Sequence, residues 1–371
     1  MTKQPSVSRA AVLREFGAPL VIEDVPIPDR IEPGAILVKT DACSICGTDV
    51  HLAAGSLALK VNLPVIIGHE MTGRIVAFGE GANRDSIGQH LKTGDRLLWT
   101  HTACGHCFYC TVARTPTLCD NRRAYMYETM AEYPYLLGGF SEYGYVLPES
   151  GRIKVPDNVH EETASLCSCA FRSVMNAFNN LGEIDAHETV VIQGVGPLGL
   201  LAIAVARVRG ARSVVAIGAP DGRLDLAGEL GADHVISIDR TTPAERLDEV
   251  RRLTDGRGAD IVMEFTGYPP AFNEGLDIAR KGARYCIVGQ LGEGEVTIKP
   301  STIVKKNINV IGAFSGDAKS YWQALQFAAQ HQAQLPISRI LTGRYALDDV
   351  NVALERMRRQ EEIKPVITFS N

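Results

Sequence analysis

The stretch that decides the fold is TVVIQGVGPLG, residues 189–199. Its first part is apolar and β-branched and predicts a buried strand, while the apolar, alanine-rich residues 198–209 predict a helix. Three glycines have the spacing Gly-x-Gly-x-x-Gly, which in this context permits a tight turn, close approach of a pyrophosphate to the backbone, and close packing of helix on strand. The stretch therefore predicts a dinucleotide-binding turn, made by Gly194, Gly196, Pro197, Leu198 and Gly199.

Strands and helices alternate on both sides of this turn. The alternation predicts a doubly wound parallel sheet over residues 171–313. The expected strands are residues 189–193, 213–217, 234–238, 261–265 and 285–288, and the expected helices include 198–209 and 223–230.

The rest of the chain has a different pattern. The 371 residues are enough for two domains. Residues 1–170 are rich in short strands, separated by glycine and proline turns, and predict an antiparallel barrel or sandwich. After residue 313 we expect a helix over 320–331, another over 347–360 and a last strand over 366–369.

The charge balance and the apolar pattern exclude some functions. Lys and Arg number 38 and Asp and Glu number 43, so the net charge of -5 provides no basic surface for nucleic acid. The one long apolar stretch, residues 189–208, contains glycine and proline and favours a strand–turn–helix over a membrane span. Residues 1–9 are polar, so we expect no secretory signal and a cytoplasmic location with reduced cysteines.

The end of the second strand bears on the choice between NAD and NADP. An acidic residue at this point would bind the adenosine ribose, but Gly218 occupies the position and Asp221 follows three residues later, in an expected loop. Without that carboxylate a 2′-phosphate is repelled less, and Arg223 could contact it or simply begin the next helix. Both cofactors stay open, and the lack of a basic cluster after Gly218 favours NAD.

Nine cysteines are present, and the odd number excludes a fully paired set of disulfides. Four of them, Cys104, Cys107, Cys110 and Cys119, have the spacing Cys-x₂-Cys-x₂-Cys-x₈-Cys. Four thiolates on short loops suit tetrahedral Zn²⁺ and leave no open coordination position, so the predicted zinc is structural. An iron–sulfur cluster is the alternative, and the absence of a second ferredoxin-like repeat disfavours it.

A second group of potential metal ligands is more dispersed. The segment CGTDVH at residues 46–51 places a thiol, a hydroxyl, a carboxylate and an imidazole within six residues, and GHE follows at residues 68–70. Taken alone, each segment could be a turn with a satisfied polar residue. Together with the dinucleotide turn and the four-cysteine segment, they indicate a functional site.

This combination of motifs resembles that of the zinc-containing medium-chain alcohol dehydrogenases, and the resemblance covers nearly the whole chain. The motifs that carry it are residues 46–51, 68–70, 94–96, 104–119, 138–143 and 194–199. The resemblance implies a GroES-like β-barrel catalytic domain formed by residues 1–170 and 314–371, and an inserted Rossmann NAD(P)-binding domain formed by residues 171–313. It also implies two zinc ions per chain and a homodimer or homotetramer.

The resemblance further implies a catalytic zinc bound by Cys46, His69 and a third ligand at the domain junction. Cys169, which a small residue and an aromatic follow, matches the family pattern better than its rival Cys167. Two further cysteines, the first of them a rival of Cys46, are expected to be small buried strand residues: Cys43 and Cys286.

For the reaction, the resemblance implies that Glu70 lies next to the metal and that Asp49 accepts the second ring N–H of His69, which fixes the tautomer. Zinc lowers the pKa of the substrate alcohol. Thr48 accepts the proton and passes it through the cofactor ribose to His51, and hydride moves to the nicotinamide. Further cofactor contacts are implied for Gly218, Arg223, Thr266, Val288, Gly289, Ala313, Phe314 and Lys364, the last of which could instead be a solvated terminal lysine.

The expected substrate is a small-molecule alcohol or carbonyl compound. Tyr125, Tyr127, Tyr133 and Tyr135 could line an apolar pocket, form a subunit contact or pack as a surface loop. Aromatic residues suit a bulky or cyclic secondary alcohol. The alternatives are a zinc-dependent polyol or threonine dehydrogenase, which usually has an acidic third ligand, a zinc-free reductase of the same superfamily, and a non-enzymatic zinc-ribbon binding protein.

Overall fold

The computed structural model describes residues 5–57, 60–290, 292 and 294–369. It divides into two compact units. Unit 1 comprises Met1–Arg172, Gly316–Gln330 and Leu341–Asn371, and unit 2 comprises Ser173–Ser315 and His331–Ile340. The boundaries expected after residues 170 and 313 lie close to these limits, whereas the sequence pattern did not predict that residues 331–340 belong to unit 2.

Unit 2 is built on a parallel sheet. Its strands are β9 (Thr189–Gln193), β10 (Ser213–Gly218), β11 (His234–Ser237), β12 (Ala259–Glu264), β13 (Ala279–Ile287) and β14 (Asn309–Gly312). Its helices are α4 (Arg172–Leu181), α5 (Pro197–Val208), α6 (Asp221–Glu229), α7 (Pro243–Leu253), α8 (Pro269–Ile278), α9 (Pro300–Lys306) and the 3₁₀ turn η3 (Ile337–Ile340).

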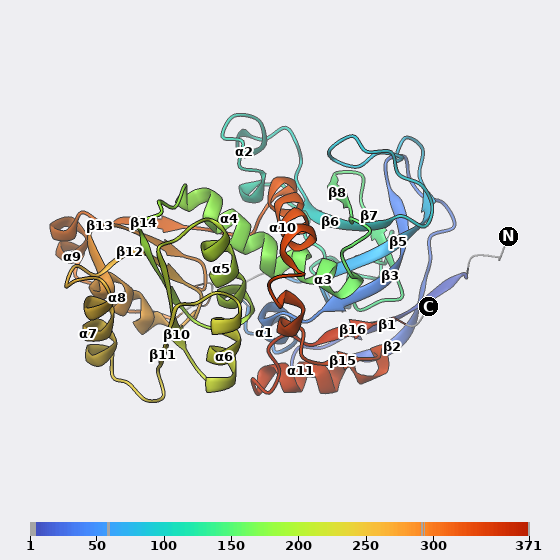
Figure 1. Cartoon of the computed structure of the whole chain (residues 1–371). Helices are drawn as coiled ribbons and strands as arrows, with labels where there is room; N and C mark the ends of the chain where they lie inside the picture. The colour runs from blue at the N-terminus through green and yellow to red at the C-terminus, as the bar shows by residue number, and fades with distance from the viewer. Residues whose placement is uncertain (1–4, 58–59, 291, 293, 370–371) are drawn as a thin grey trace. The chain divides into compact units, whose positions relative to one another are not determined.

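The six strands pair in the order β11-β10-β9-β12-β13-β14, and all neighbours are parallel. The order reverses at β9, so α5 and α6 lie on one face of the sheet and α7, α8 and α9 on the other (Figure 1). The predicted doubly wound sheet is confirmed. Strands β9 and β12 are neighbours in this sheet, so their carboxyl ends lie side by side. Sheets of this topology bind ligands at that point.

Most of the apolar stretch at residues 189–208 is buried in unit 2, while its last residue, Val208, is exposed. All five residues of β9 are buried, and so are the residues from Gly199 to Ala206 in α5. A helix that is apolar all round needs such burial. Within the described residues, no helix is long and apolar enough to cross a membrane.

Unit 1 is built on two mainly antiparallel sheets. A seven-stranded sheet has the order β15-β16-β3-β5-β6-β8 with β7 also paired to β3, and a three-stranded sheet has the order β2-β1-β4. The strands are β1 (Val7–Leu13), β2 (Val21–Pro26), β3 (Ile36–Ser44), β4 (Val65–Ile66), β5 (Glu70–Phe78), β6 (Arg96–Thr102), β7 (Tyr143–Val146), β8 (Ser150–Lys154), β15 (Arg344–Tyr345) and β16 (Val366–Thr368).

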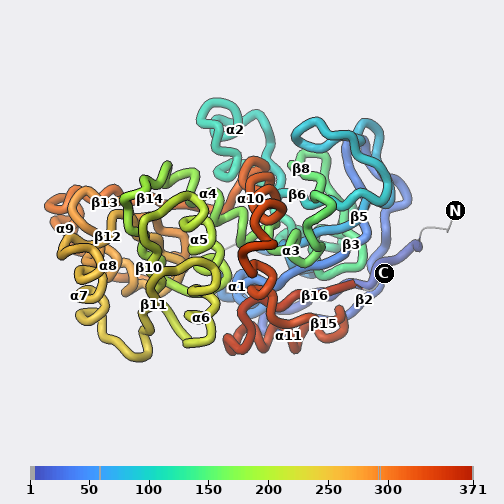
Figure 2. The backbone as a smooth tube through the Cα atoms, viewed as in Figure 1, coloured from blue at the N-terminus to red at the C-terminus, as the bar shows by residue number. Residues whose placement is uncertain are grey.

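The C-terminal segment completes the larger sheet of unit 1. Strand β16 pairs antiparallel with β3, and Figure 2 shows the red C-terminal segment running beside this blue strand. The helical elements of unit 1 are α1 (Gly47–Ala53), α2 (Phe108–Thr111), η1 (Pro116–Leu118), α3 (Glu161–Leu166), the π-helical turn η2 (Cys167–Phe171), α10 (Ala318–His331), η4 (Leu347–Asp349) and α11 (Val350–Arg358).

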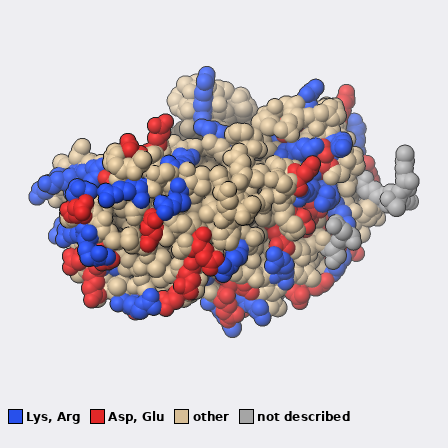
Figure 3. Space-filling model, in the orientation of Figure 1, with Lys and Arg blue, Asp and Glu red and all other residues tan. Residues whose placement is uncertain are grey.

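Charged side chains of both signs are mixed over the face of the molecule drawn in Figure 3. This distribution agrees with the nearly balanced composition of 38 basic and 43 acidic residues.

Candidate metal and dinucleotide sites

Cys46 lies at the junction between β3 and α1, where it precedes the first residue of the helix. Asp49, in the first turn of α1, accepts a hydrogen bond from the backbone N–H of Cys46 through Oδ2 at 2.8 Å. Such a contact satisfies a donor at the start of the helix that would otherwise lack a partner. Asp49 thereby holds the backbone that carries the Cys46 thiol.

His69 precedes β5 and is buried. Its Nδ1 lies 3.2 Å from Asp49 Oδ1, and because a carboxylate can only accept, Nδ1 carries the proton. Nε2 is then available as a ligand and lies 3.2 Å from Sγ of Cys169. The contact that the orienting role of Asp49 requires is therefore present, and the role itself stays a prediction.

The third candidate ligand comes from the π-helical turn η2. Ligand atoms of Cys46, His69, Glu70 and Cys169 all lie within 4.8 Å of one another. Cys167 is fully buried, its burial raises the pKa of its thiol, and it is not a member of this group. Of the two rivals, Cys169 is thus the one that the structure brings to His69.

The donor set of this group fits zinc. Cys46 shares a hydrogen bond with Cys169, which lowers the pKa of the Cys169 thiol well below its usual value and raises that of Cys46. For His69, burial lowers the pKa, but the Asp49 carboxylate and Cys169 outweigh it and raise the pKa overall. The group thus offers two sulfurs, one of them favoured as a thiolate, and one imidazole nitrogen. Zn²⁺ in catalytic sites is commonly bound by such ligands.

Glu70 lies behind these ligands in a fully buried ion pair. Its Oε1 accepts from Nζ of Lys364 at 2.5 Å, and its Oε2 accepts from the hydroxyl of Ser44 at 2.5 Å. Burial raises the pKa of Glu70 to about 7, against the opposing effect of the Lys364 ammonium. Both carboxylate oxygens thus have partners within the chain, and Cys46, His69 and Cys169 remain the predicted metal ligands.

The alternative of a solvated terminal lysine is wrong for Lys364. Its side chain is 1% exposed, because Lys364 lies inside unit 1, two residues before strand β16, where Glu70 holds its ammonium. Its predicted contact with a pyrophosphate stays a prediction.

Thr48 and His51 lie on α1. The Thr48 hydroxyl is 3.6 Å from Sγ of Cys46, whereas His51 is exposed and its Nδ1 lies 3.2 Å from the hydroxyl of Ser56. Residues three apart on a helix are neighbours on its surface. The helix thus places a hydroxyl beside a candidate ligand and an imidazole at the solvent, as the predicted proton path requires.

His101, which belongs to β6, lies outside all the sequence motifs. Its ring stacks with that of His69 at a centroid distance of 6.2 Å, and its Nδ1 accepts the backbone N–H of Tyr125 at 3.1 Å. Burial, together with the nearby arginines, lowers the pKa of His101 well below its usual value, so this ring is neutral. A lone histidine five residues into a strand carries no local signal of this contact.

The tyrosine-rich segment has two different environments. Sδ of Met126 lies 3.1 Å from Nδ1 of His69, and Tyr127 follows it, half-buried. Tyr133, in contrast, donates to or accepts from Tyr145 through the two hydroxyls at 2.6 Å. Only the first part of the segment therefore lies beside the candidate metal ligands.

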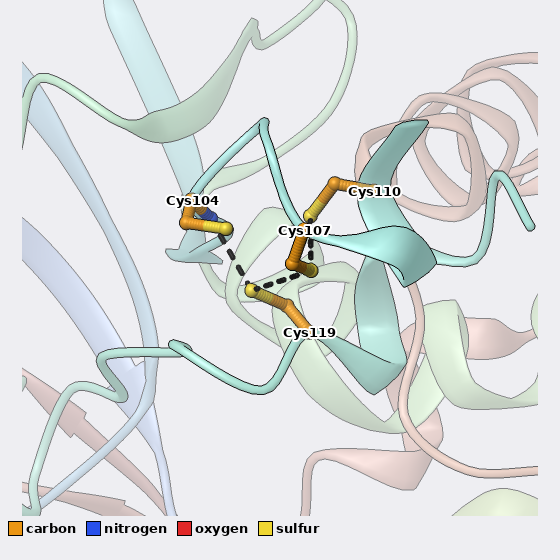
Figure 4. A group of neighbouring side chains, drawn as sticks. All are labelled: Cys104, Cys107, Cys110 and Cys119. Atoms are coloured by element: carbon orange, nitrogen blue, oxygen red, sulfur yellow. Dashed lines mark hydrogen bonds between the residues drawn. The ribbon is translucent and has the colours of Figure 1, made fainter. Parts of the chain in front are cut away.

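The four-cysteine segment folds into a compact group of sulfurs (Figure 4). The Sγ atom of Cys107 lies 3.5 Å from that of Cys110 and 3.8 Å from that of Cys119. Four thiolates about 2.3 Å from one tetrahedral ion lie about 3.8 Å apart. An iron–sulfur cluster, with a thiolate on each iron, would spread the sulfurs further, so the distances fit a single ion better.

The dinucleotide turn connects β9 to α5, as expected. Gly194 has φ +100°, and a Cβ at Gly199 would lie 1.8 Å from the carbonyl oxygen of Gly194, so the chain itself requires both glycines. Gly196 is different, because its φ is -76° and a Cβ there would meet no atom within 4 Å. Neither conformation nor packing explains this glycine, whereas close approach of a phosphate to the backbone would.

The end of β10 differs in part from expectation. Gly218 packs against the turn, since a Cβ there would lie 2.4 Å from Cγ2 of Val195. Asp221 does not lie in a loop, because it begins α6, where it pairs with Arg240 at 2.5 Å. Arg223 lies in the first turn of α6, and its burial lowers the pKa of its guanidinium.

A buried carboxylate that the sequence did not single out organises the neighbouring loops. Oε1 of Glu264, at the end of β12, accepts from the backbone N–H of Thr266 at 2.6 Å and of Gly267 at 2.8 Å, and Oε2 accepts from that of Gly289 at 3.2 Å. The remaining predicted contacts also follow strands: Val288 and Gly289 follow β13, and Ala313 and Phe314 follow β14. These loops lie at the carboxyl ends of the strands, where open α/β sheets bind ligands.

Comparison with known families accounts for both units. The model of the alcohol dehydrogenase GroES-like domain matches residues 32–157, and the model of the zinc-binding dehydrogenases matches residues 197–330. The chain belongs to the zinc-containing medium-chain alcohol dehydrogenases. As a member of this family it is an oxidoreductase, and nothing supports the alternative of a non-enzymatic zinc-ribbon protein.

Relatives of this dehydrogenase match along almost the whole chain. The 5-exo-hydroxycamphor dehydrogenase of Pseudomonas putida is 36% identical, over 97% of this chain and 98% of its own length. An L-threonine 3-dehydrogenase of Edwardsiella ictaluri is 32% identical, over 94% and 95%. The crystal structure of an alcohol dehydrogenase from Thermotoga maritima has a TM-score of 0.93 at 34% identity, over 98% of this chain and 99% of that one.

Proposed function

We propose that this dehydrogenase oxidises a secondary alcohol with a bulky or cyclic skeleton to the ketone, in a reversible reaction that transfers hydride to NAD or NADP. The observation that carries the proposal is the convergence of ligand atoms from Cys46, His69 and Cys169. The hydroxyl of Thr48 lies beside this group. Such an arrangement suits an alcohol oxygen that must be polarised and deprotonated, or in the reverse direction a carbonyl oxygen that must be polarised and protonated.

Two separate groups of residues would bind two zinc ions. Zinc held by Cys46, His69 and Cys169 supplies Lewis-acid chemistry toward an alcohol or carbonyl oxygen. Asp49 keeps Nε2 of His69 directed at this position, and Lys364 holds the Glu70 carboxylate behind it. The four-cysteine group would bind a second, structural zinc.

The proton of the substrate hydroxyl leaves through α1 in this proposal. Thr48 accepts it through Oγ1, next to Cys46. His51, three residues later and exposed, acts as the outer base of this path and releases the proton to solvent. Helix α1 thus supplies both groups of the proton path, Thr48 beside the candidate metal ligands and His51 at the solvent.

Two observations support a bulky or cyclic substrate. Met126 and Tyr127 place apolar surface beside His69, and the name of the Pseudomonas putida relative denotes an alcohol on a camphor skeleton. A threonine-type dehydrogenase is the second candidate, because a relative of that name is 32% identical. The cysteine at position 169 favours the first candidate, because zinc-dependent polyol and threonine dehydrogenases usually have an acidic residue as the third zinc ligand.

For the nucleotide, the open space at Gly196 supports a bound pyrophosphate. The absence of a carboxylate at Gly218 leaves room for a 2′-phosphate, and no basic cluster follows it. We therefore propose NAD as the preferred cofactor, with NADP accepted.

A substrate screen tests the proposal. The purified zinc-loaded protein is assayed with bicyclic secondary alcohols, cyclohexanol, ethanol, a polyol and L-threonine, each with NAD and with NADP, by the absorbance of the reduced nicotinamide. We expect the highest kcat/KM for a cyclic secondary alcohol with NAD. A preference for L-threonine or a polyol would establish the second candidate, and no turnover of any alcohol would contradict the proposal.

Replacement of the Thr48 hydroxyl is expected to slow turnover. Thr48→Ala should lower kcat by about 10²–10⁴-fold, the usual contribution of a positioned proton acceptor, with little change in bound zinc. Thr48→Ser, which keeps a hydroxyl at the same place, is the matched control and should retain most of the activity. Equal kcat values for Thr48→Ala and the wild type would remove Thr48 from the proton path.

A further inference from the structure

Arg172 is a buried cation that the proposed mechanism does not use. It begins α4 directly after the turn that carries Cys169, and it is 3% exposed. Its Cζ lies 5.0 Å from the centroid of the Tyr321 ring, and its Nη1 donates to the carbonyl oxygen of Gly316 at 3.2 Å. The stacked ring and the carbonyl hold the planar guanidinium in one orientation. Neither group is an anion, so neither neutralises its positive charge.

Burial lowers the pKa of Arg172, but the charges of Tyr321 and Cys169 and a side-chain hydrogen bond with Cys169 raise it overall. Cys169 lies in the π-helical turn η2, and Arg172 follows this turn as the first residue of α4. The other buried cation of this region, Lys364, is engaged by the Glu70 carboxylate. Among the described residues, Arg172 is thus a buried cation that interacts with a candidate ligand sulfur.

We propose that Arg172 is a positioning residue that fixes the sulfur of Cys169 and withdraws electron density from it, and so tunes the metal at this site. The inference rests on the proposed catalytic zinc. A charge-assisted hydrogen bond to a thiolate stabilises its lone pairs and weakens it as an electron donor. The metal then keeps more of its Lewis acidity, an effect that groups behind the ligands commonly exert.

Cobalt substitution tests this role without turnover, because Co²⁺ bound to thiolates has a charge-transfer absorption band. We expect Arg172→Met, with Co²⁺ as the probe, to move this band to longer wavelength, since the sulfur regains electron density. Arg172→Gln, which keeps a polar head group without charge, should move it less. In the zinc protein, Arg172→Met should also lower kcat/KM by about 10–100-fold.

The chain offers a matched control in Arg209. Its Cζ also lies 5.0 Å from a ring centroid, that of Phe178, and its Nη1 also donates to a carbonyl, that of Phe178, at 3.2 Å. It belongs to unit 2, where its guanidinium contacts Phe178 and not a candidate metal ligand. Arg209→Met should therefore leave the cobalt band unchanged.

The outcomes separate this inference from the proposed function. A folded Arg172→Met protein whose cobalt band equals that of the wild type overturns the inference, and so does an equal shift in Arg209→Met. If Arg172→Met does not fold, the band of Arg172→Gln decides by the same criterion, and failure of both to fold assigns Arg172 a purely structural role. A wild-type protein with a cobalt–thiolate band but no alcohol oxidation would contradict the proposed function alone.

Discussion

Replacement of Cys169 by alanine is expected to lower kcat/KM for the alcohol by at least about 10³-fold, or about 4 kcal/mol of transition-state stabilisation. The same variant should lose one of two bound zinc ions and keep its fold. The reason is geometric, because Sγ of Cys169 lies 3.2 Å from Nε2 of His69 and completes the group with Cys46. Bound zinc per chain, measured by atomic absorption, and steady-state rates check both parts.

Cys167→Ala is the matched control for this experiment. Cys167 lies two residues earlier in the same turn, is fully buried and is outside the group of ligand atoms. Its replacement removes one sulfur from the core, so it should cost some stability and keep two zinc ions and the activity. Loss of zinc in Cys167→Ala, with normal zinc in Cys169→Ala, would reverse the assignment. Unchanged zinc and activity in both variants would remove the catalytic zinc from the proposal.

Loss of the structural zinc is expected to open the segment of residues 104–119. Cys107→Ser should lower the local stability of this segment by on the order of 10 kcal/mol, the scale of zinc-coupled folding in small domains. The segment has little core of its own, since Cys119 is its one buried residue and Phe108, Val112 and Leu118 are exposed. A metal must therefore supply the stability that apolar burial does not.

Limited proteolysis measures this opening. We expect cleavage within residues 104–119 in Cys107→Ser, and the same cleavage in the wild type after treatment with a chelator. Cys286→Ala is the control, because Cys286 is buried in β13 and lies outside both cysteine groups. It should bind two zinc ions and resist cleavage. A Cys107→Ser variant that binds two zinc ions and resists the protease would show that this segment is stable without the metal.

Local motifs account for the parts of this protein that could be predicted from the sequence. The strand β9 and the glycine turn were expected at the residues where they are found, because the hydrophobic run and the spacing of Gly194 and Gly199 act within ten residues. The four cysteines also converge within a short segment, because only short loops separate them. The fold class and the family follow from these local patterns and their order along the chain.

The tertiary structure decided the contacts between residues that are far apart in the chain. Cys169 meets His69 across 100 residues, and Lys364 meets Glu70 across 294. No spacing rule specifies such pairs, because they depend on how β16, β5 and the η2 turn pack together. The same holds for Glu264, whose buried carboxylate binds the loops after β12 and β13. The sequence by itself determined which residues could bind zinc and a dinucleotide, and the packing of distant elements decided which side chains hold them in place.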